Sequence, residues 1–150
     1  MEVVRTTRKF YGKTPPGCIE CHREIKAQRY GKTTIKGQPF TVQECEVYIV
    51  KAKDGREEWT CLRCGEALAA INKETPYETM PVSAMRGSID LWWFLWANNI
   101  EEISLKELYE KTQCRNGAHK AKIRQWLWNM RKTGRAVLMD RKKHIYRFLL

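Results

Sequence analysis

Two Cys-x-x-Cys pairs constrain the possible folds of this chain more than any other feature. Cys18 and Cys21 form the first pair, and Cys61 and Cys64 form the second, with 39 residues between the pairs. Two residues between thiols allow both sulfurs to turn toward one point, and two such pairs complete a tetrahedral shell of four thiolates around a zinc ion. We therefore predict one structural zinc ion bound by these four cysteines. Two disulfides, or a coincidence of spacing, are the alternatives.

The other thiols and the nearest histidine fit this site poorly. His22 adjoins Cys21, and adjacent side chains rarely reach the same ion, so we do not expect it to be a ligand. Cys45 alternates with Val47 and Ile49 and is predicted to be a buried, inert thiol. Cys114 stands alone near a predicted turn, so we expect a structural role, with an exposed reactive thiol as the alternative. Four thiolates leave no open coordination position, and no nucleophile arrangement is visible, so we do not expect an enzyme.

The segments around the two pairs indicate a small zinc-binding domain over residues 15–75. Extended segments at residues 38–42 and 46–50 lead to the turn signal Asp54-Gly55. Residues 65–73 favour a helix, which places the second pair at a helix N-terminus, where the helix dipole favours thiolates. A knuckle, a hairpin and a helix that begins with the second pair resemble a treble-clef zinc finger. A zinc ribbon is the alternative, and the helix-forming residues 67–70 disfavour it.

Helical signals dominate after residue 87. Ser88 is predicted to cap a Trp-rich helix over residues 89–96, and a capping box at Ser104 and Glu107 predicts a second helix. After a turn at residues 113–117, a third helix runs from about residue 118 to 133, and Gly134 ends it. Residues 135–139 and 144–150 favour two strands, and a basic loop joins them.

Three helices followed by a hairpin with a basic tip resemble the winged-helix form of the helix-turn-helix domain, over residues 87–150. The resemblance implies that the third helix enters the major groove of double-stranded DNA and that the wing contacts the backbone. The same fold used only for protein contact is the alternative.

Charge placement supports DNA as the partner. The chain has a net charge of +11, and residues 115–150 contain eleven basic side chains and one acidic one. No carboxylate occurs over the 29 residues from Lys111 to Met139, which suits a phosphate backbone. The predicted phosphate contacts are Lys122, Arg131, Lys132, Arg141, Lys142 and Lys143. The candidate base-edge readers are Arg115, Asn116, His119, Lys120, Arg124 and Gln125. Gln125 is the best single candidate because it falls opposite the apolar stripe of the helix.

The predicted organisation is an α+β chain with two domains. A basic N-terminal arm (residues 1–14) precedes the zinc-binding domain (15–75), a linker (76–86) and the winged-helix domain (87–150). Arg5, Arg8, Lys9 and Lys13 either lie along DNA or belong to a frayed terminus.

The predicted function is double-stranded DNA binding, as a transcription regulator. The alternative is a protein-binding module that recruits or inhibits a transcription or replication machine through the zinc domain, and RNA binding is a third possibility. No apolar stretch approaches the roughly 20 residues of a membrane span, and no secretory signal is visible, so we expect an intracellular protein without a membrane partner. The target sequence and the oligomeric state stay open.

Overall fold

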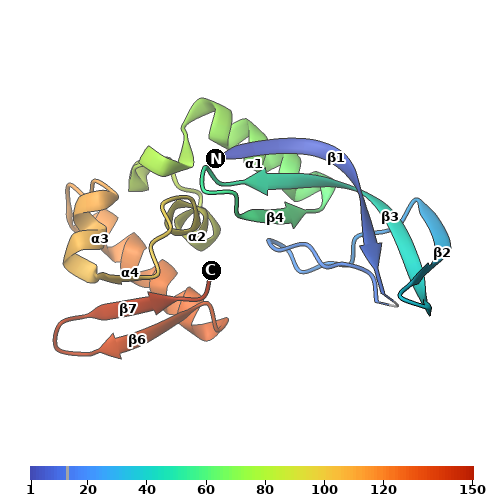
Figure 1. The fold of residues 1–150 in the computed structure, drawn as a ribbon. Coiled ribbons are helices and arrows are strands. Elements are labelled where there is room, and N and C mark those ends of the chain that lie inside the picture. The colour runs from blue at the N-terminus through green and yellow to red at the C-terminus, as the bar shows by residue number, and fades with distance from the viewer. Residues whose placement is uncertain (13) are drawn as a thin grey trace. The chain divides into compact units, whose positions relative to one another are not determined.

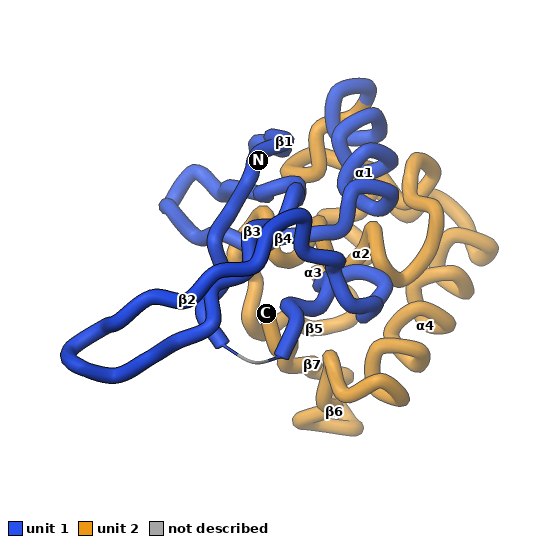
Figure 2. Tube along the Cα trace, turned by 90° about the vertical axis from the view of Figure 1, so that its right-hand side faces the viewer, with its two compact units in different colours: residues 1–74 blue, residues 75–150 orange. Residues whose placement is uncertain are grey.

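The computed structural model describes residues 1–12 and 14–150. The chain is α+β and divides into two compact units, residues 1–74 and 75–150, which Figure 2 shows in blue and orange. The boundary falls where helix α1 (Leu62–Glu74) ends. Among the described residues, none of the helices has both the length and the apolar character that a membrane crossing requires.

Strand β3 organises the first unit. The elements of this unit besides α1 are β1 (Glu2–Tyr11), β2 (Arg29–Ile35), β3 (Gln38–Lys51) and β4 (Glu57–Thr60). All strand pairs are antiparallel. β1 lies along one side of β3, while β2 and β4 pair with opposite ends of its other side (Figure 1). The two extended segments predicted at residues 38–42 and 46–50 are therefore one continuous strand. The predicted turn at Asp54-Gly55 connects β3 to β4, and Gly55 has a φ of +93° there.

The side chains of β3 alternate between the two faces of the sheet, as the strand period of two requires. Cys45, Val47 and Ile49 are buried and form an apolar cluster with Cys18 and Ile25. The prediction that Cys45 is a buried thiol is confirmed, and burial raises its pKa.

The N-terminal residues form a strand in this sheet instead of the separate basic arm predicted for residues 1–14. Their cations are matched by carboxylates of the neighbouring strands: Arg5 bonds Glu46 at 2.9 Å and Arg8 bonds Glu57 at 3.0 Å. The backbone pairing of residues 2–11 with residues 42–51 of β3 makes this segment a strand, and the two ion pairs, to β3 and β4, balance its charges. Lys13, the fourth basic residue of the predicted arm, lies outside the described residues.

The second unit combines helices with a small sheet. Its elements are two 3-10 turns, η1 (Tyr77–Thr79) and η2 (Val82–Ala84), followed by α2 (Ser88–Ala97), β5 (Glu102–Ser104), α3 (Leu105–Lys111), α4 (Gly117–Lys132), β6 (Ala136–Asp140) and β7 (Ile145–Phe148). The sheet order is β5-β7-β6, with both pairs antiparallel. Strand β5 was not expected. It is three residues long and is defined by its pairing with β7, which a local pattern does not reveal.

Residues 76–86 are part of the second unit, and the prediction of a linker there is wrong. Tyr77, Met80 and Val82 are fully buried. The carboxylate of Asp90 in α2 is also fully buried, and it accepts hydrogen bonds from the Tyr77 hydroxyl at 2.5 Å and from the Arg86 guanidinium at 2.8 Å. A buried charge needs such partners, so this network holds the segment against α2.

Two of the three predicted helix caps agree with the structure. Ser104 caps α3 by accepting the backbone N–H of Glu107 at 3.3 Å, as the capping box predicts. Gly134, just after α4, has a φ of +77°, the left-handed conformation that ends helices. A turn separates α3 from α4. Ser88, however, is the first residue of α2, and the cap position belongs to Gly87.

Candidate metal centre

The first cysteine pair sits in a tight loop. Gly17 and Glu24 form an isolated antiparallel bridge, and within it the N–H of His22 donates to the carbonyl of Cys18 at 2.9 Å. The Cys18 N–H in turn donates to the carbonyl of Arg23 at 2.9 Å. His22 has a φ of 62°, so the chain turns back directly after Cys21. The turn brings both thiols of the pair to one side of the loop.

The second pair is placed by the start of α1. Cys61 precedes the helix and Cys64 lies in its first turn, and the N–H of Gly65 donates to the Cys61 carbonyl at 2.9 Å. The helix begins at Leu62, three residues before the predicted start. Both thiols therefore lie at the helix N-terminus, as predicted, near its unpaired N–H groups.

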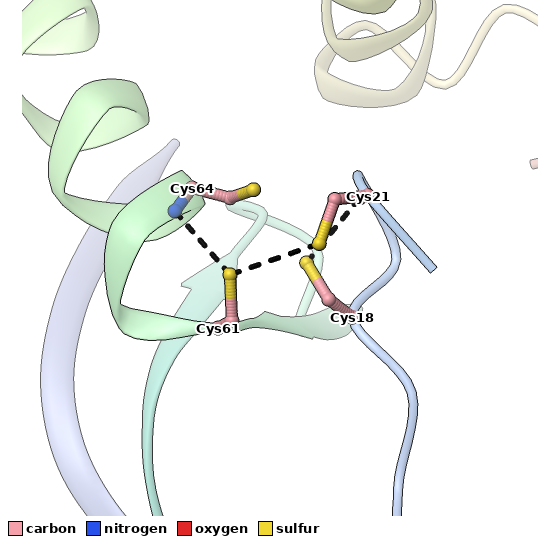
Figure 3. A group of neighbouring side chains, drawn as sticks. All are labelled: Cys18, Cys21, Cys61 and Cys64. Carbon is pink, nitrogen blue, oxygen red and sulfur yellow. Dashed lines mark hydrogen bonds between the residues drawn. The ribbon is translucent and has the colours of Figure 1, made fainter. Parts of the chain in front are cut away.

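The four thiols face one common space (Figure 3). Their sulfur atoms all lie within 4.8 Å of one another, and the sulfurs of Cys21 and Cys61 are 3.9 Å apart. Four sulfurs bound at about 2.3 Å to a tetrahedral ion are separated by about 3.8 Å. A disulfide requires about 2.05 Å, and all four cysteines are free. The predicted convergence of these cysteines is confirmed, and the arrangement is compatible with one metal ion.

Backbone amides point at two of the sulfurs. The N–H of Cys21 donates to the sulfur of Cys18 at 3.5 Å, and the N–H of Cys64 donates to the sulfur of Cys61 at 3.4 Å. Such bonds favour negatively charged sulfur. One sulfur of each pair thus accepts a backbone hydrogen bond of the kind that a metal-bound thiolate accepts.

Burial and neighbouring groups shift the pKa of three of the four thiols, and not all in the same direction. Burial raises the pKa of Cys18, and burial together with the neighbouring thiols raises the pKa of Cys64. Burial acts on Cys21 as well, but the backbone N–H of Arg23 and the adjacent thiols outweigh it and lower the pKa of Cys21. Thiols this close cannot all ionise without a positive charge among them, and a bound divalent cation would supply it.

Contacts of strand β4 hold the loop of the first cysteine pair beside the second pair. The indole N–H of Trp59 donates to the carbonyl of Gly17 at 3.0 Å, and the Trp59 carbonyl accepts the N–H of Ile19 at 3.2 Å. Phe10 packs edge-on against the Trp59 ring at a centroid distance of 5.1 Å. Because Trp59 is two residues before Cys61, these contacts hold the first loop beside the second pair. The sequence analysis did not identify this role for Trp59, and its position next to Cys61 is the only signal.

Gly65 has a steric function at this site that its sequence position does not reveal. A Cβ atom at residue 65 would lie 2.3 Å from the Cβ of Tyr48 and 2.4 Å from the hydroxyl of Thr60. Real Cβ atoms do not approach other heavy atoms so closely. Glycine is therefore what allows the first turn of α1 to pack against β3 and β4.

Replacing Gly65 with alanine is expected to destabilise residues 1–74 by about 3 kcal/mol, because overpacking outweighs the roughly 1 kcal/mol by which alanine favours a helix. Native-state hydrogen exchange of the β3 amides measures this free energy. The matched control is Gly31→Ala in β2, where an added Cβ meets nothing within 4 Å and the stability should be unchanged or slightly higher. Equal stability of both variants would contradict the steric argument.

The remaining candidate ligands lie outside the cluster. His22 is exposed and is not among the residues that converge there, as expected. Cys114 is half-buried in the second unit, where its sulfur lies 3.5 Å from the hydroxyl of Thr112.

The residues predicted to contact DNA lie in three places: the approach to α4, the helix itself, and the β6–β7 turn. All twelve are exposed except His119, which is half-buried. Asn116 caps α4 by accepting the N–H of His119 at 2.9 Å, and Nδ1 of His119 accepts the N–H of Arg115 at 3.2 Å. These two side chains thus have a structural task at the start of the helix.

The cations of α4 lie along its exposed face. Arg124 donates to the hydroxyl of Tyr109 at 3.2 Å, and the ammonium of Lys120 lies 5.4 Å from the centre of the same ring. The Gln125 amide donates to Asn129 at 3.3 Å. Ile123, Leu127 and Met130 occupy the buried face, so the predicted apolar stripe is confirmed at these positions.

Comparison with known proteins yields no match to a protein-family model, to a curated protein or to a solved structure.

Proposed function

We propose that this protein binds double-stranded DNA through residues 75–150 and that a zinc ion holds residues 1–74 in their fold. Regulation of transcription is the role most consistent with such a chain. The proposal rests on the shape and charge of the second unit and on the donor set of the first.

The order of elements in the second unit supports the winged-helix interpretation. A helix, a short strand, two helices joined by a short turn and a hairpin follow one another as α2, β5, α3, α4 and β6–β7. In that arrangement α3 and α4 correspond to the helix-turn-helix, and the hairpin corresponds to the wing. The short strand β5 adds to this support because it pairs with the hairpin at β7.

The exposed face of α4 is the observation that carries the proposal. It presents five cations, two neutral polar or aromatic side chains and no carboxylate. These exposed residues are Lys120, Lys122, Arg124, Gln125, Trp128, Arg131 and Lys132. A helix that met only water would mix signs to form i,i+4 pairs, whereas this one suits a polyanion. Gln125 lies among the cations, and a glutamine side-chain amide can form two hydrogen bonds with the major-groove edge of adenine.

The β6–β7 turn of the second unit contains three further cations. Arg141, Lys142 and Lys143 are exposed in it. Asp140 accepts the backbone N–H groups of Lys142 and Lys143, each at 2.9 Å, which lowers the pKa of its carboxyl. The single acid of this region is thus engaged in shaping the turn, and the three cations are available to phosphates.

Zinc is the metal that the four thiolates of the first unit suit best. Soft sulfur ligands in a tetrahedral set favour zinc among the common cellular cations. A complete shell of four protein ligands leaves no site for water or substrate, so the ion is proposed as structural and the protein as a binding protein without enzymatic activity. The loop at residues 17–24 and the helix that begins at the second pair support the treble-clef interpretation.

The test is binding of the full chain to a random-sequence duplex pool across a salt series, with the selected sequences read out. A recovered sequence motif with a steep salt dependence is the expected result, because phosphate contacts release counterions and base contacts select. Salt-sensitive binding without a motif would reduce the proposal to non-specific DNA binding. An absence of binding would contradict it and favour a protein partner.

A further inference from the structure

A further candidate surface lies on the first unit, at the end of the sheet where β2 joins β3. An open hollow of about 370 Å³ is present there. Two cross-strand rows run through it: Tyr11, Val42 and Gly31 form one row, and Lys9, Glu44 and Arg29 form the next. Side chains in directly paired positions project from the same face of a sheet, so these six share one face.

This face is opposite to the buried one. Glu44 and Val42 alternate along β3 with the buried residues Gln43 and Cys45. Figure 1 shows the β2 end of the sheet extending away from α1, and Figure 2 shows the same hairpin projecting from the rest of the blue unit. Within residues 1–74 the hollow is therefore accessible.

Two exposed aromatic rings give the face its apolar character. Tyr11 is 57% exposed, and Phe40, one row further along β3 on the same face, is 39% exposed. Gly31 contributes no side chain, and an atom added at its Cβ position would meet nothing within 4 Å. The floor beside Tyr11 is thus Val42 and backbone, a flat surface that a planar ring can cover. Exposed rings on a sheet are the platforms on which unpaired bases stack.

The rim of the hollow is positive. No carboxylate occurs from Ile25 to Gln43, a span that contains four basic residues. Of these, Arg29 projects from this face, whereas Lys32 pairs with Thr41 and projects from the other. Among the described residues, Glu44 is the one acid that lines the hollow, and it lies 4.0 Å from the ammonium of Lys9. Cations that follow the edge of an aromatic surface are the arrangement that binds the sugar-phosphate backbone of a single strand.

We propose that this face of β1, β3 and β2 binds single-stranded DNA, with bases stacked on Tyr11 and Phe40 and phosphates held by Arg29 and Lys9. An acidic peptide would use the same cations but would leave the two rings without a function, so the rings favour a nucleic acid. The choice of DNA over RNA rests on the function proposed for residues 75–150. The face would let the protein hold an unpaired strand in addition to the duplex that it recognises.

The test uses the metal-loaded full chain and a labelled twelve-residue oligothymidylate, with affinity followed by fluorescence anisotropy over a salt series. Replacing Tyr11 and Phe40 together with alanine should weaken binding at least tenfold, because each lost stacking platform removes a base contact. Tyr11→Phe should bind like the unaltered protein because it keeps the ring. Arg29→Ala should lower the salt slope by about 0.7, the value for one phosphate contact on a single strand. Lys53→Ala, an exposed cation in the β3–β4 turn, is the charge-matched control and should have no effect.

The outcomes separate this proposal from that for the second unit. Lys142→Ala with Lys143→Ala should weaken duplex binding and leave oligothymidylate binding unchanged. The variant in which Tyr11 and Phe40 are replaced should weaken oligothymidylate binding and leave duplex binding unchanged. Unchanged oligothymidylate affinity in the double aromatic variant, with its metal content and circular dichroism preserved, would overturn the proposal. So would oligouridylate binding tenfold more tightly than oligothymidylate, or equal competition by an oligoglutamate peptide.

Discussion

Replacing Cys61 with serine is expected to abolish metal binding and to unfold residues 1–74 while residues 75–150 stay folded. The four sulfurs lie within 4.8 Å of one another, and they link a loop and a helix that the chain separates by 39 residues. Structural zinc contributes on the order of 10–16 kcal/mol to folding, which equals or exceeds the whole net stability of a typical domain. Loss of one thiolate removes a large part of that contribution and leaves three close thiols without a compensating charge.

Two measurements check this result. Metal content per chain should fall from one equivalent to none. Hydrogen exchange should become fast at the β3 amides and stay slow at those of α2 and α4. The matched control is Cys114→Ser, which removes a thiol outside the cluster and should retain one equivalent of metal. A chelator added to the unaltered protein should reproduce the effect of Cys61→Ser. A Cys61→Ser protein that keeps its metal, or a first unit that stays folded without metal, would show that the four cysteines do not hold a structural ion.

Replacing Lys142 and Lys143 with alanine is expected to weaken binding to all duplexes alike, by roughly tenfold to a hundredfold at physiological salt. Both ammonium groups are exposed in the β6–β7 turn, and their backbone N–H groups are already bound by Asp140, so the turn should keep its shape. Each phosphate contact on duplex DNA contributes about 0.9 to the slope of log K against log salt, so the slope should fall by about 1.8. Titrations at four or more salt concentrations measure both quantities.

The matched comparison is Gln125→Ala with Lys120→Ala on α4. These side chains are proposed to read bases, so the variant should lose about 1–3 kcal/mol on the preferred duplex and much less on unrelated ones. Sequence specificity should decrease, and the slope of log K against log salt should fall by no more than the contribution of the one lysine that is replaced. If neither pair of replacements alters duplex affinity, the second unit does not bind DNA through α4 and its hairpin.

The sequence alone predicted the features that depend on neighbouring residues. The spacing within each Cys-x-x-Cys pair, the cap at Ser104 and the stop at Gly134 are local signals, and the structure agrees with each. The apolar stripe of α4 and the burial of Cys45 follow from the helix and strand periods in the same way. At these positions the nearby residues strongly favour one local conformation, and more distant parts of the chain do not change it.

Tertiary structure decided the features that depend on distant residues. Residues 2–11 became a strand because their backbone pairs with residues 42–51 of β3, from 31 to 49 positions away. Residues 76–86 became part of a core, in which Tyr77, Met80 and Val82 are buried and the N–H of Val82 donates to the carbonyl of Thr112, 30 positions away. Neither partner is visible in a local window, since charge and proline content there indicate an exposed segment.

The same limit applies to the two surfaces with proposed functions. The positive surface of α4 could be predicted from the sequence because all its cations lie on one helix. The hollow beside Tyr11 could not be predicted, because the residues that line it come from three strands. The register of those strands sets which side chains share a face. Strand register is fixed by long-range pairing, and a shift of one residue would have turned every side chain of that face to the other side of the sheet.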